Sequence, residues 1–132
     1  MNIEKPVDIE NEIRLALDDY FETYCRPLPE QYGLPNVVVE QTGGTPANTI
    51  DSFQIKLSVR AKTDADAIDT MRDVLGVLEY QTENQFGALR HISVNSLASW
   101  GSDPARPDLK LCTMTAIVIA HRETYEITTR RN

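Results

Sequence analysis

The chain has 132 residues, enough for one domain with its own core, and its 41% hydrophobic and 25% charged residues are ordinary for a globular protein. The formal net charge of −7 argues against a surface that grips nucleic acid, because the phosphate backbone requires a basic face. Two cysteines are too few for a disulfide framework, and no apolar run is long enough to span a membrane. We therefore expect a single domain over residues 1–132.

The first predicted element is a helix over residues 7–24. Its apolar side chains recur at steps of three and four residues, and Asp8 is a suitable N-cap. The Arg26–Pro27 step should end it, since proline disfavours helix in the preceding residue. Residues 1–30 carry eight acids against three bases, which a solvated acidic helix face explains most simply.

Two strands and a hairpin are expected next. Residues 36–40 are rich in valine, and residues 42–49 are rich in turn formers. Residues 52–61 alternate regularly, so that Phe53, Ile55, Leu57 and Val59 should face the core.

A second helix should begin at the N-cap Thr63 and run to about Tyr80. Acidic residues in its first turns resemble a calcium loop, but an EF-hand starting at Asp64 would need glycine where Asp69 stands and glutamate where Leu75 stands. Favourable placement of acids at the positive helix end is the simpler explanation. The expected buried side consists of Ala65, Ile68, Met71, Leu75 and Leu78.

A third strand over residues 90–98 leads into a proline-rich loop over residues 99–108. The loop contains the sole tryptophan, Trp100, and Arg106. Tryptophan is enriched at binding hot spots, but it can equally anchor a loop to its own domain. Both interpretations of Trp100 stay open.

The last predicted strand, residues 109–121, has no charged residue after Lys110 on either side. It therefore needs cover on both faces, and in so short a chain one cover is expected to come from a neighbouring molecule. We expect the neighbour on the side of Met114, Ala116 and Val118, or on the alternate side if the register differs. The chain turns polar from about residue 122, and this tail should be mobile until assembly orders it. The candidate docking residues are Arg106 in the proline-rich loop and Arg122, Arg130 and Arg131 in this tail.

The predicted order is α-β-β-α-β-β, an α+β fold. The economical arrangement is a four-stranded, mainly antiparallel sheet with both helices on one face.

No catalytic, cofactor or metal site is expected. The histidines His91 and His121 and the cysteines Cys25 and Cys112 form no close ligand pair, and no P-loop, GxGxxG, GxSxG or HExxH pattern occurs. Cys112, inside an apolar strand, should be an inert thiol with a raised pKa.

The order of segments resembles the small tail-terminator, or tail-completion, proteins of long-tailed bacteriophages. The similarity lies in the acidic first helix, the strand VVVE at residues 37–40 with its long hairpin, the strand FQIKLSVR at residues 53–60, the helix opening DADAID at residues 64–69, and the closing strand after the Pro-Ala-Arg-Pro loop.

The resemblance implies a structural virion protein that forms a ring, typically of six copies, and has no enzymatic activity. Made in the host cytoplasm, it would end the tail tube and contact the tail-tube protein and a head-completion or neck protein. The genome would pass through the lumen without specific binding. An acidic wall suits such a channel, because it would not hold DNA.

Two rival hypotheses come from other classes. One is a small-molecule-binding regulatory domain, in which the loops at residues 43–48 and 99–108 would close over a ligand. The other is a small enzyme with scattered acids, which ranks last.

Overall fold

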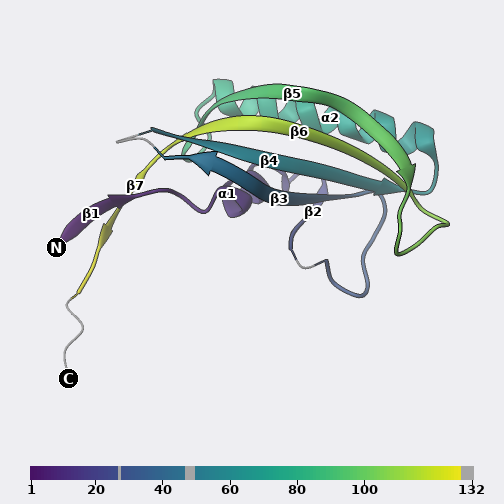
Figure 1. Cartoon of the computed structure of the whole chain (residues 1–132), viewed down its shortest axis with the longest axis horizontal. Helices are drawn as coiled ribbons and strands as arrows, with labels where there is room; N and C mark the ends of the chain where they lie inside the picture. The colour runs from purple at the N-terminus through teal and green to yellow at the C-terminus, as the bar shows by residue number, and fades with distance from the viewer. Residues whose placement is uncertain (27, 47–49, 129–132) are drawn as a thin grey trace.

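The computed structural model describes residues 1–26, 28–46 and 50–128 (Figure 1). The elements, in chain order, are β1 (Asn2–Lys5), α1 (Ile9–Leu17), β2 (Glu22–Cys25), β3 (Asn36–Thr45), β4 (Ile50–Ala61), α2 (Asp64–Glu83), β5 (Leu89–Ser102), β6 (Lys110–His121) and β7 (Glu123–Glu126).

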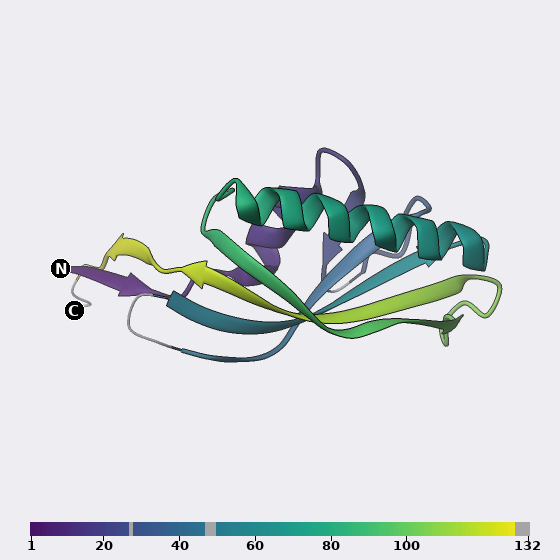
Figure 2. The same cartoon turned by 90° about the horizontal axis from the view of Figure 1, so that it is seen from above.

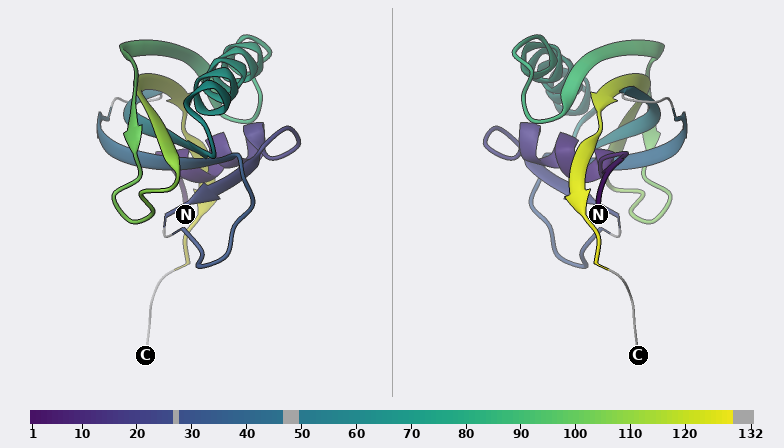
Figure 3. Two further views of the ribbon diagram at one scale, coloured as in Figure 1. Left: turned by 90° about the vertical axis from the view of Figure 1, so that its right-hand side faces the viewer. Right: turned by 90° about the vertical axis from the view of Figure 1, so that its left-hand side faces the viewer.

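The main sheet has five strands in the order β2-β3-β4-β6-β5. All its pairs are antiparallel except β2–β3, which is parallel. Both helices lie on one face and leave the other face open (Figures 2 and 3). The predicted α+β class is therefore confirmed, but the sheet has more strands than the predicted four. No helix in the described part of the chain is both long and apolar enough to cross a membrane.

The extra strand comes from a region predicted to be helical. Helix α1 starts as expected, with the Asp8 side chain accepting from the Asn11 N–H at 3.2 Å, but it ends at Leu17. Residues 22–25 instead pair with β3, and Thr23, opposite Val37, is buried. Pairing along the edge of the sheet therefore overrides the helical spacing of Tyr20 and Phe21, and Tyr20 is 61% exposed.

The predicted inward side of β4 is confirmed. Phe53, Ile55, Leu57 and Val59 are all buried. Helix α2 packs on this face and has the predicted N-cap, since the Thr63 hydroxyl accepts from the Asp66 N–H at 3.1 Å. Its buried stripe differs in part from the prediction: Ala65 is exposed, while Ile68 and Leu75 are only partly buried. The buried side chains of the stripe are Ala67, Met71, Val74, Leu78, Gln81 and Thr82.

Strand β6 is central, paired with β4 on one side and β5 on the other. Its even-numbered residues from Cys112 to Ala120 are buried beneath the helices, whereas Leu111, Ile117 and Ile119 on the open face are half-buried. The placement of Met114, Ala116 and Val118 at a contact with a neighbour is therefore wrong. The same hydrophobic alternation is compatible with either face, and the helices decide which one is covered.

The β5–β6 connection is shorter than predicted, because Ser99–Ser102 continue β5. Trp100 stands opposite Cys112 in the register, and its side chain lies outside the described part of the structure. The loop is tied down by Asp103, whose carboxylate accepts from Arg60 Nε at 2.8 Å.

The first and last described strands form a separate two-stranded sheet, which we call the arm (β1 and β7). The arm extends away from the main sheet at the end where β3 and β4 meet (Figures 1 and 2). Residues 123–126, which belong to the predicted polar tail, form β7 and pair with residues 2–5. Arg130 and Arg131 lie outside the described residues.

Candidate functional site

The arm is amphipathic, and its register shows why. Ile3 lies opposite Tyr125, and Met1 exchanges backbone hydrogen bonds with Ile127 at 2.8 and 3.3 Å. Since residues two apart on a strand share a face, Met1, Ile3, Tyr125 and Ile127 lie on one face. The opposite face is polar and consists of Asn2, Glu4, Thr124 and Glu126.

The part of the subunit that the structure describes leaves most of the apolar face of the arm exposed. Met1 is 80% exposed, Tyr125 43% and Ile127 45%. The Lys5 ammonium lies 3.5 Å from the centroid of the Tyr125 ring and covers only the inner end of this face. An isolated two-stranded ribbon is marginally stable in water, so an arm of this kind gains most from contact with another surface.

The base of the arm is pinned to the main sheet by a buried ion pair. Arg122, between β6 and β7, donates from Nε and Nη2 to the Asp51 carboxylate at 3.0–3.3 Å. The Asp51 side chain is only 3% exposed. The candidate docking residue Arg122 is therefore already engaged within the subunit.

A second contact joins the arm to α1. Burial raises the pKa of Glu12, and the neighbouring carboxylate of Glu123 on β7 raises it further through Coulombic repulsion and a side-chain hydrogen bond. The Ala88 N–H, 3.4 Å from Glu12 Oε2, acts in the opposite direction. Both carboxyl groups border a polar cavity of about 420 Å³.

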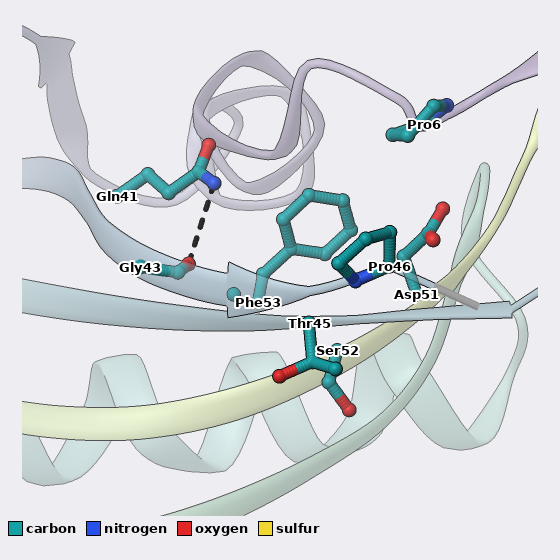
Figure 4. Close-up of a pocket in the computed structure, with 9 residues that line it drawn as sticks. Pro6, Gln41, Gly43, Thr45, Pro46, Asp51, Ser52 and Phe53 are labelled. Atoms are coloured by element: carbon teal, nitrogen blue, oxygen red, sulfur yellow. Dashed lines mark hydrogen bonds between the residues drawn. The ribbon is translucent and has the colours of Figure 1, made fainter.

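A more apolar cavity of about 300 Å³ lies at the base of the arm. Phe53 from β4, Pro46 from the β3–β4 connection and Pro6 from the end of the arm border the same space (Figure 4). Gly43 and Gly44 complete the wall on β3. The one carboxylate in the lining, Asp51, is paired with Arg122, so the cavity is suited to an apolar side chain.

Beside this cavity, no described strand pairs with the outer edge of β3. Residues 36–39 pair with β2, whereas Gln41 and Gly43–Thr45 pair with β4 alone among residues 1–26, 28–46 and 50–128. The Gln41 N–H points outward and donates to Glu10 Oε2 at 2.9 Å, while the Gly43 carbonyl accepts from the Gln41 side-chain amide at 3.3 Å. These two main-chain groups at the edge are therefore hydrogen-bonded to side chains and not to a neighbouring strand.

Acidic residues are concentrated on one side of the subunit. The helix layer, which we define as residues 8–19 and 64–83, carries eleven acids and two arginines, more negative charge than the net −7 of the whole chain. The six acids of α2 are all exposed. The remainder of the chain is therefore slightly basic, and the helix-bearing side is the acidic side.

The predicted contact residues whose side chains the structure describes are not brought together. Met114, Ala116 and Val118 belong to the core, and Arg106 pairs with Asp108 at 3.0 Å at the exposed end of the β5–β6 loop. The arm was not predicted from the sequence. The available signal was the match between alternating Met1 and Ile3 and alternating Tyr125 and Ile127, which lie more than 120 residues apart.

The two loops of the regulatory-domain hypothesis lie at opposite ends of the sheet. Ser52, beside the β3–β4 connection, pairs with Ile119, whereas the other loop follows Ser102, which pairs with Lys110. They cannot close over one ligand. In the described part of the chain, no group of three or more His, Cys, Asp or Glu side chains is placed to hold a metal ion. As predicted, burial raises the pKa of Cys112.

Comparison with protein-family models finds no match, and comparison with curated proteins finds none either.

Proposed function

We propose that this protein is a structural subunit that assembles into a ring, ends the growth of a phage tail tube and joins the tail to the head. The observation that carries the proposal is the arm, whose apolar face projects from the subunit with Met1, Tyr125 and Ile127 exposed and Ile3 half-buried. A projecting apolar ribbon suits an assembling subunit better than an isolated ligand-binding domain.

A ring follows from the way in which such an arm is used. If the arm meets a different part of the next copy, the contact is head-to-tail, and repeated head-to-tail contacts close into a ring when the rotation permits. The resemblance in element order to tail-terminator proteins supports six copies.

The helix layer supports the assignment of the lumen. Its eleven acids and two arginines give one side of the subunit a strong negative charge. Facing inward, the exposed acids of α2 would repel the phosphates of passing DNA, which is the requirement for a channel that conducts a genome without holding it. The flanking surfaces would contact the tail-tube protein and a head-completion or neck protein in the virion.

The first test is the mass of the purified protein, by light scattering over a range of concentrations, together with negative-stain microscopy. We expect rings, and a strict monomer at high concentration would overturn the proposal. Ile127→Gln should weaken association about tenfold by removing a half-exposed apolar side chain from a contact. Leu15→Gln on α1 is the matched control, since Leu15 is equally exposed at 45%, and it should leave association unchanged.

The second test is genetic. Deleting the gene from the genome that encodes it should leave filled heads without joined tails, together with tail tubes of abnormal length. Normal virions, or loss of a metabolic activity instead, would overturn the proposal and favour a small-molecule-binding regulatory domain.

A further inference from the structure

We propose that the arm of one copy docks on the free edge of β3 in a second copy of this chain, where it adds a strand beside residues 41–45 and places an apolar side chain in the cavity over Phe53. The inference deepens the proposed function and rests on its self-assembly.

The backbone provides the first argument. In an antiparallel pair, alternate residues direct both main-chain groups away from the partner strand. At the outer edge of β3, the Gln41 N–H and the Gly43 carbonyl bond to the side chains of Glu10 and Gln41, and an incoming strand would replace these side-chain bonds with main-chain bonds. Gly43 and Gly44 have no side chains to shield this edge. The free segment has five residues and each arm strand has four, so the lengths match. Adding a strand to an exposed edge is an established mode of recognition.

The cavity provides the second argument. At about 300 Å³ it has room for a large apolar side chain, and the arm presents two near its end, Met1 and Ile127. A subunit cannot fill its own cavity with them. Pro6 is itself part of the cavity wall, and β1 ends at Lys5 immediately before it, so the arm starts at the cavity and points away (Figures 1 and 4). Met1 and Ile127 can therefore enter this cavity only from another copy of the chain.

Charge favours a second copy at this place. Two copies of a chain with a net charge of −7 repel each other electrostatically in most orientations. The arm itself carries three acids, Glu4, Glu123 and Glu126, and one base, Lys5. Residues 41–50 contain no charged residue. The two carboxylates beside this segment, Glu40 on β3 and Glu10 on α1, are both paired with Arg26 at 3.1 Å, which reduces their repulsion of the acidic arm.

The test is disulfide capture between two different variants of the full chain, both carrying Cys25→Ser. One variant carries Ile127→Cys on the arm and the other Thr45→Cys at the β3 edge, and they are mixed under mild oxidation. We expect a covalent pair that contains one of each variant. The control is Leu15→Cys mixed with Thr45→Cys, which should form at least tenfold less of the mixed product.

Each outcome is decisive when the mass in solution is measured on the same samples. Association with preferential capture supports the docking. Association without preferential capture overturns the docking but leaves the proposed ring intact. Capture confined to closed dimers supports the docking and overturns the ring, because reciprocal exchange of arms would then satisfy both sites. A strict monomer overturns both.

Discussion

Arg122, at the start of the arm, forms a buried ion pair with Asp51 of the main sheet. The guanidinium donates through its single Nε–H, shared between the two oxygens, and through Nη2 to a carboxylate that is almost completely buried. Asp51 lies on β4 beside the apolar cavity, and Arg122 lies at the first residue after β6. The pair therefore sets the direction in which the arm leaves the body.

Arg122→Met should destabilise the fold by about 3 kcal/mol, because it removes the cation that compensates a buried carboxylate. Chemical denaturation measures this, and hydrogen exchange should show faster exchange in β7. Arg106→Met is the control, since the Arg106–Asp108 pair is exposed, and the unfolding midpoint should not change. If Arg122→Met and Arg106→Met lowered the free energy of unfolding equally, the burial of Asp51 would not explain the contribution of Arg122 to stability.

Introducing a negative charge at two neighbouring residues of β6 should affect folding differently. Val118 is 1% exposed beneath the helices, so Val118→Glu should prevent folding, whereas Ile117 on the open face is half-buried, so Ile117→Glu should remain folded. Circular dichroism and thermal melting distinguish the two. Loss of folding in both variants would mean that the open face is covered in the folded protein.

Self-association should strengthen as salt is raised from about 0.02 to 0.3 M. The net charge of −7 and the acidic helix layer make copies repel one another, and the screening length falls from roughly 20 Å to below 10 Å over this range. Sedimentation velocity at several salt concentrations measures the change. Weaker association at high salt would instead indicate that the contact between copies is dominated by ion pairs.

Glu12→Gln should stabilise the protein at neutral pH. Burial first, and then Glu123, raise the pKa of Glu12 above its ordinary value of 4.5. Folding therefore favours the protonated form, and this contribution is fully present below about pH 4.5 and is lost as the pH rises through the folded pKa. The amide mimics the neutral acid, so the variant should have the higher melting temperature at pH 7.

The two melting temperatures of Glu12→Gln and the parent should converge as the pH is lowered towards 4. Glu83→Gln is the matched control, since Glu83 is exposed near the end of α2. A Glu12→Gln advantage that persists unchanged at low pH would contradict the protonation argument.

Sequence alone determined the features that depend on neighbours along the chain. The N-caps Asp8 and Thr63 were predictable because a capping side chain bonds to a backbone N–H three residues on. The inward side of β4 was predictable because period-two alternation is local. The α+β class followed from the order of these elements.

Only the tertiary structure decided the rest. Residues 22–25 become a strand because the edge of β3 is available to pair with them, and no local pattern records that edge. The covered side of β6 depends on where the helices lie, so Met114, Ala116 and Val118 proved to be core residues. The arm arises because Met1 and Ile127 meet across the whole length of the chain. Local pattern therefore determined where the capped helices begin and which side of β4 is apolar, whereas contacts between distant residues decided which faces are covered and which project.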